Sequence, residues 1–158
     1  MFKKSFSIYF FTLIAFAILI FGCVKETKQP TNKYNIYKSE LEKEIWVTNQ
    51  IIGLNPEIGK YSLKKKNQKK FAGNLTVFLN NQNFKSYYTS FCGNDYFTTV
   101  YGKYNFFEKN KLSVTIDSIT YSGEWKKPTE FKKNEEIIFI ISKNKDLIIL
   151  NKEDNFSF

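Results

Sequence analysis

Residues 74–91, NLTVFLNNQNFKSYYTSF, contain the pattern that decides the fold of this chain. Successive side chains of a β-strand point to opposite faces of the sheet. The first half alternates in this way: Leu75, Val77 and Leu79 share one face, and Thr76 and Phe78 share the other. The polar NNQN then turns the chain, and FKSYYTSF returns it. The stretch therefore predicts an antiparallel hairpin.

Four later segments are also predicted to be β-strands. They are YFTTVYGKYNFF (96–107), KLSVTIDSITYSG (111–123), EIIFIIS (136–142) and DLIILNK (146–152). The first two alternate between apolar and polar residues, and the last two are unbroken apolar runs, which indicate burial on both faces. Gly102 lies inside the first of them, where a glycine suggests that the strand bends. The short turns EKNK and KNK join neighbouring segments.

Upstream of the hairpin, residues 46–52 are β-branched and aromatic, and Gly53 and Pro56 close them. We expect a first strand there. The chain then has about seven strands joined by short turns. This spacing predicts a mainly β fold, an antiparallel up-and-down meander curled into a small barrel.

One short N-terminal helix is expected before the first strand, in YKSELEKEIW (37–46). Ser39 and Glu42 have the spacing of a capping box. Leu41 and Ile45 fall on one face at i and i+4. These features predict a helix of two turns.

The N-terminus has the organisation of a secretory signal: Lys3 and Lys4 precede an apolar stretch over residues 6–21. Its end, Ile20-Phe21-Gly22-Cys23, resembles the lipobox of bacterial lipoproteins, although Phe21 is bulkier than the residue usual there. The resemblance implies cleavage before Cys23 and acylation of that cysteine. The alternative is an uncleaved helix with a chance cysteine. Both interpretations place the rest of the chain outside the cytoplasm.

Three parts of the chain are therefore expected. Residues 1–22 are a lipoprotein signal peptide, and residues 23–35 are the lipid anchor and a polar tether. Residues 36–158 are the β domain. From Trp46 to the final aliphatic hairpin, this domain resembles the lipocalin-like and META-type small β domains of bacterial envelope lipoproteins, including uncharacterised Bacteroidetes-type ones. The resemblance implies that Trp46 closes one barrel end and that the protein is anchored in the cell envelope, at the outer membrane.

The composition excludes several kinds of chemistry. The chain has no His, so Ser-His and Cys-His catalysis cannot be built. It has no glycine-rich phosphate loop and no calcium loop, and Cys92 alone does not make a zinc site. We therefore expect no metal, no cofactor and no enzymatic activity. The remaining alternative is a hydrolase that uses carboxylates such as Asp95, Asp117 or Glu124.

The net charge of +9 comes from lysine alone, and residues 60–70 hold six lysines. We expect a solvated loop or an edge strand there, the alternative being a patch for anionic head groups or an acidic partner. Without arginine, nucleic-acid binding is not expected. Cys92 is expected to be a small buried residue at a strand end, the alternative being a reactive thiol in an exposed turn.

Aromatic residues crowd the two strands on either side of Cys92. The inward ones either fill the barrel or line an apolar cavity, and outward ones could form a patch for a protein or glycan partner. The candidate ligand-binding residues are Trp46, Tyr88, Tyr101 and Tyr104. The predicted function is a lipid-anchored binding or interaction module for an apolar small molecule or a protein partner. The alternative is a structural or stress-related envelope lipoprotein without a ligand.

Overall fold

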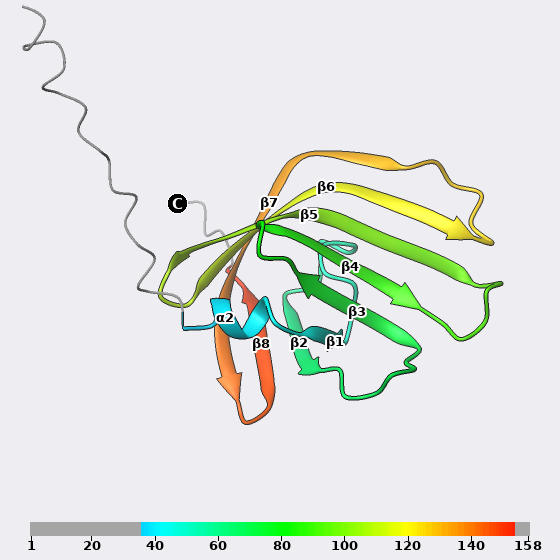
Figure 1. Ribbon diagram of the computed structural model, residues 1–158. Coiled ribbons are helices and arrows are strands. Elements are labelled where there is room, and N and C mark those ends of the chain that lie inside the picture. The colour runs from blue at the N-terminus through cyan, green and yellow to red at the C-terminus, as the bar shows by residue number, and fades with distance from the viewer. Residues whose placement is uncertain (1–35, 154–158) are drawn as a thin grey trace, which may run out of the picture. The chain divides into compact units, whose positions relative to one another are not determined.

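The computed structural model describes residues 36–153, apart from the side chain of residue 134. The predicted signal peptide, Cys23 and the tether lie outside the described residues. The described elements are one short helix and eight strands (Figure 1). They are α2 (Lys38–Leu41), β1 (Ile45–Thr48), β2 (Lys60–Lys65), β3 (Gly73–Phe78), β4 (Asn83–Thr89), β5 (Tyr96–Glu108), β6 (Lys111–Gly123), β7 (Glu130–Asn144) and β8 (Leu147–Lys152).

All eight strands belong to one antiparallel sheet, which confirms the predicted mainly β class. From β3 to β8 each strand pairs with the next along the chain. The sheet then closes on itself, because β2 pairs with β8 and β1 pairs with both β2 and β3. A strict up-and-down order is therefore wrong at the start. β1 lies between β2 and β3, so the chain passes β1 on its way from β2 to β3.

The lysine-rich stretch provides the eighth strand. β2 is paired on both sides, by β1 and by β8, so the expected solvated loop or edge strand is wrong. Tyr61 and Leu63 are buried, while Lys60 and Lys64 are exposed. Tyr61 and Leu63 lie at alternate positions and both point inward, so the segment forms a strand although most of its other residues are lysines.

Two expectations for the N-terminal part of the domain are also corrected. The helix is one turn instead of two, its N-cap is Tyr37, and no side chain caps it, so the predicted capping box does not form. The first strand ends at Thr48 instead of residue 52. Ile51 and Ile52 are buried, but they lie in the loop that follows β1.

This loop, residues 49–59, turns toward the interior of the sheet. The Ile52 N–H donates to the buried Ser86 hydroxyl at 2.9 Å, and the Gly53 N–H lies 3.4 Å from the Tyr61 hydroxyl. Gly53 has a φ of +79°, and a Cβ there would lie 2.3 Å from Ile116. The turn that carries Ile51 and Ile52 into the core therefore needs glycine for both its conformation and its space.

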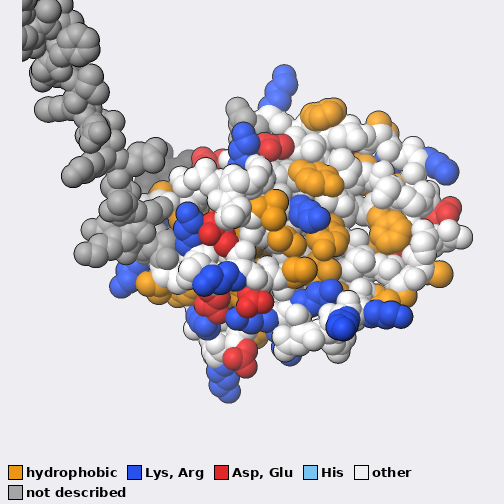
Figure 2. All heavy atoms as spheres, viewed as in Figure 1, with side chains coloured by type: hydrophobic (Ala, Val, Ile, Leu, Met, Phe, Trp, Pro, Cys, Tyr) orange, Lys and Arg blue, Asp and Glu red, His pale blue; other side chains and the backbone are white. Residues whose placement is uncertain are grey.

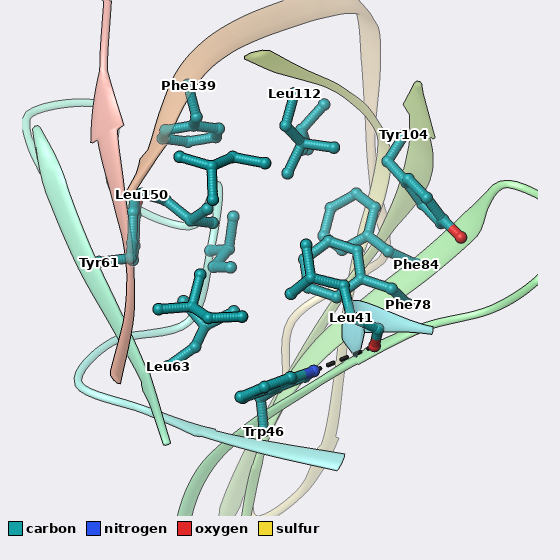
Figure 3. Packing of buried hydrophobic residues seen from close by; sticks show 14 of the residues in the cluster. Leu41, Trp46, Tyr61, Leu63, Phe78, Phe84, Tyr104, Leu112, Phe139 and Leu150 are labelled. Carbon is teal, nitrogen blue, oxygen red and sulfur yellow. Dashed lines mark hydrogen bonds between the residues drawn. The ribbon is translucent and has the colours of Figure 1, made fainter. Parts of the chain in front are cut away.

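The core is a single cluster of buried apolar side chains to which α2, the 49–59 loop and all eight strands contribute (Figure 3). Its largest fully buried members are Trp46, Tyr61, Phe78, Phe84 and Phe139. Aromatic rings meet edge to face, with centroids 5.7 Å apart for Tyr61 and Phe139 and 5.2 Å apart for Phe78 and Tyr104. The inner face of the sheet is thus filled by side chains.

Candidate functional site

The four candidate ligand-binding residues do not form one site. Trp46 and Tyr104 are buried in the core, and Tyr88 packs against the same cluster while partly exposed. Tyr101 is on the outer face and 43% exposed. The structure therefore brings three of the four to the interior and separates the fourth.

The two buried members of this set make hydrogen bonds within the fold. The Trp46 indole N–H donates to the Leu41 carbonyl, and the Tyr104 hydroxyl contacts Glu42 Oε1 at 2.8 Å and the Leu79 carbonyl. Burial, and then the Glu42 carboxylate, raise the pKa of Tyr104 well above its usual value. Both side chains thus hold α2 and the strands together.

A second, partly exposed group of rings lies where β5 begins and β6 ends, and one of them, Tyr121, packs against the core cluster. We call Tyr96, Tyr121, Trp125 and Lys127 the aromatic cluster. The Trp125 ring stands edge-on between the two tyrosines, with centroid distances of 5.0 Å to Tyr96 and 5.7 Å to Tyr121. The Lys127 ammonium lies 4.7 Å from the centre of the Trp125 ring and 5.4 Å from that of Tyr121. The cluster therefore combines three rings with one positive charge.

The chain direction after β6 explains why these residues meet. Gly123 pairs with Tyr96 and has a φ of +70°, and a Cβ there would lie 2.0 Å from the Asp95 carbonyl oxygen. The turn brings Trp125 back over the sheet, where its indole N–H donates to the Thr98 hydroxyl at 3.2 Å. The ring is thus fixed in orientation, although it is only partly buried.

The tyrosines of the cluster differ in their surroundings. Tyr96 is 55% exposed. The Tyr121 hydroxyl bonds to Glu130, and burial followed by this carboxylate raises the pKa of Tyr121 to about 12. The Tyr121 hydroxyl therefore keeps its proton at neutral pH. Rigid rings with a polar edge are the side chains that dominate binding at protein interfaces.

The loop between β4 and β5 borders the cluster. The Asp95 carboxylate accepts hydrogen bonds from the Tyr96 N–H at 2.7 Å and from the Tyr88 hydroxyl at 3.1 Å. The Tyr96 N–H, then Ser90 and Tyr88, lower the pKa of Asp95. Cys92 is exposed in this loop, so the expected burial is wrong; the chain leaves the sheet after Thr89, before Cys92 reaches it.

The three carboxylates of the hydrolase alternative are divided between two places. The Glu124 N–H donates to the Asp95 carbonyl at 3.0 Å, so these two residues are neighbours. Asp117 is exposed at a register shift within β6. The lowered pKa of Asp95 suits a fixed hydrogen-bond acceptor and not a proton donor.

Sequence reasoning missed a set of buried hydroxyls on the inner face of four strands. They are Thr48 on β1, Thr76 on β3, Ser86 on β4 and Thr98 on β5. Thr76 and Ser86 bond each other at 2.7 Å. The Thr48 hydroxyl has no hydrogen-bond partner among residues 36–153. Their signal in the sequence is a Ser or Thr at an inward position of each strand.

Within the described part of the chain, no three His, Cys, Asp or Glu side chains gather as a metal site would require. No helix among residues 36–153 has the length and apolar character needed to cross a membrane. No known protein family, curated protein or solved structure matches this chain.

Proposed function

We propose that this chain is a lipid-anchored, lipocalin-like β domain of the bacterial cell envelope that binds a protein partner through the aromatic cluster. The closed ring of strand pairs supports a small barrel. The lipobox-like Ile20-Phe21-Gly22-Cys23 supports lipidation of Cys23 and a place in the envelope, at the outer membrane.

The aromatic cluster is the observation that carries the proposal. Its rings are fixed by Thr98 and by one another, so a partner would bind without a large cost in side-chain ordering. An apolar small molecule is the less favoured ligand, because the interior of the sheet is filled by the core cluster. The Lys127 ammonium favours a partner segment that places a carboxylate beside an apolar side chain.

Site-specific photocrosslinking in cells tests the partner. A photoreactive phenylalanine analogue replaces Tyr96, and for comparison Phe131, which is 82% exposed and pairs with Ser118 on β6. We expect one discrete product from position 96, lost on Trp125→Ala, and none of that size from position 131. Equal products from both positions, or none from either, would instead support a structural envelope lipoprotein without a ligand.

The anchor is tested separately. Mass spectrometry of the mature protein should find Cys23 as the first residue with acyl chains on its sulfur and amine. Cys23→Ala should release the protein from membranes, because the acyl chains supply the attachment. An unmodified Cys23 within an uncleaved chain would refute the anchor and leave the crosslinking result to stand alone.

A further inference from the structure

The outer surface of β1, β3, β4 and β5 carries a second apolar region, distinct from the aromatic cluster. We call it the outer apolar face: Ile45, Val47, Leu75, Val77, Tyr87 and Tyr101. Strand register makes these residues neighbours, because Val47 pairs with Leu75 and Leu75 pairs with Tyr87. Ile45 and Tyr101 are 41% and 43% exposed. Leu75 is buried, yet it does not belong to the core cluster, so it forms the floor of this face.

Lysines are the prevailing charged side chains along β2, β3 and β4, although Glu44 lies beside Ile45. Residues 58–94 contain seven lysines and no Asp or Glu. Lys64 pairs with Val47 on the neighbouring strand, and the Lys85 ammonium lies 5.1 Å from the centre of the Tyr87 ring. Lys103 is exposed two residues after Tyr101. Figure 2 shows hydrophobic side chains gathered over β3 and β4 with lysines among and beside them.

A hollow adjoins the face at its β1 and β2 side. Its volume is about 350 Å³, and its lining combines Val47 and Phe71 with Lys64, Lys65, Lys66, Asn67 and Gln68. Glu44 pairs with Lys65 at 2.9 Å, which leaves Lys64 and Lys66 with no ion pair among the described residues. An apolar wall under ammonium groups matches a molecule with a negative head and an apolar body.

We propose that the outer apolar face and its lysines bind a bilayer surface rich in anionic phospholipid. Ammonium groups attract the phosphates, and Ile45, Val77 and Tyr101 reach the level of the acyl chains. The inference extends the proposed function. Twelve residues separate Cys23 from Ile36, so the two are at most about 47 Å apart, and a lipidated Cys23 keeps the domain beside the bilayer.

Vesicle cosedimentation of residues 24–158 tests this without the anchor. That segment contains every described strand and every member of the core cluster, so the contacts among residues 36–153 are retained. The probes are phosphatidylcholine vesicles with and without phosphatidylglycerol. We expect binding only to the anionic vesicles, weakened by added salt. Lys85→Gln with Lys103→Gln should weaken binding roughly thirty-fold, since each lysine near the surface contributes severalfold.

Two further variants make the test specific. Ile45→Thr with Tyr101→Thr keeps the charge and should also weaken binding, because the exposed apolar area is lost. Lys126→Gln with Lys133→Gln removes the same charge away from the face and should leave binding within about twofold of wild type. Equal losses from both lysine pairs, or no binding to anionic vesicles, would overturn the proposal. Trp125→Ala should bind vesicles normally, so a failure of the protein-partner proposal is seen separately.

Discussion

The indole N–H of Trp46 donates a hydrogen bond to the backbone oxygen of Leu41, 3.0 Å away, and both side chains are fully buried (Figure 3). Leu41 is the last residue of α2, where carbonyl groups lack partners within the helix. Trp46 lies on β1, which pairs with both β2 and β3. One side chain therefore fastens the single helical turn to the point where the sheet closes.

Trp46→Phe should lower the free energy of unfolding by about 2–3 kcal/mol, because the Leu41 carbonyl stays buried without its donor and the ring is smaller. Urea unfolding followed by circular dichroism measures this change. Trp125→Phe is the matched control. Its indole N–H bonds the Thr98 hydroxyl at a partly exposed site, so we expect a loss below about 1 kcal/mol. Equal losses in the two variants would mean that the hydrogen bond to Leu41 contributes no more to stability than the hydrogen bond to Thr98.

Ser86→Ala should detach the 49–59 loop from the inner face. The Ser86 hydroxyl accepts from the Ile52 N–H at 2.9 Å and bonds Thr76 at 2.7 Å. Removing it leaves a buried N–H unpaired, which costs about 1–3 kcal/mol. Hydrogen exchange at the Ile52 amide should accelerate more than exchange in β6. Ser142→Ala, at an exposed position of β7, should change the stability by less than about 0.5 kcal/mol.

The hairpin of residues 74–91 was predictable because its alternation and its turn are local. The structure has strands at Gly73–Phe78 and Asn83–Thr89. Alternation did not say which face is inward. Thr76 and Phe78 point into the core, while Leu79 is 41% exposed. That choice depends on pairing with Trp46 and Ser86, which lie elsewhere in the sequence.

The order of β1 and β2, and the aromatic cluster, could not be predicted for the same reason. β2 pairs with β8, which lies near the other end of the domain's sequence, and no local sequence pattern indicates that pairing. Tyr96 and Trp125 are 29 residues apart and meet only because β5 pairs with β6 along their length. The residue types indicated many aromatic side chains, but the sheet register decided which rings contact one another.

Gly102→Ala should be strongly destabilising. The pairing of β5 with β6 shifts register between Tyr101 and Gly102, as the predicted bend implies. A Cβ at Gly102 would lie 2.1 Å from the Thr115 backbone oxygen and 2.6 Å from Phe84. Because a backbone oxygen cannot rotate away, the two strands must separate, at a cost of about 1–3 kcal/mol or more. Gly59→Ala is the control, since a Cβ there meets nothing within 4 Å. Thermal unfolding of both variants measures the difference.

We expect ionisation of Tyr104 to lower the free energy of unfolding at alkaline pH. Its pKa is raised by burial and by Glu42, whereas an unfolded tyrosine ionises near about pH 10. Its contribution is complete below that pH and falls as the pH rises toward the folded pKa, because the unfolded chain loses its proton first. Burial also raises the pKa values of Tyr61 and Tyr87, so the wild type alone cannot isolate one residue.

Urea unfolding of wild type and Tyr104→Phe, from neutral pH to about pH 11, separates the contribution of Tyr104. At neutral pH the variant should be less stable by about 1–2 kcal/mol, since the Leu79 carbonyl and Glu42 lose the one hydroxyl proton that they share. The difference should shrink above about pH 10, because the variant has no proton to lose at this position. Tyr96→Phe, at an exposed ring, should change the stability at neutral pH by less than about 0.5 kcal/mol. A constant difference between wild type and Tyr104→Phe would show that Tyr104 stabilises the fold by packing and not through its protonated hydroxyl.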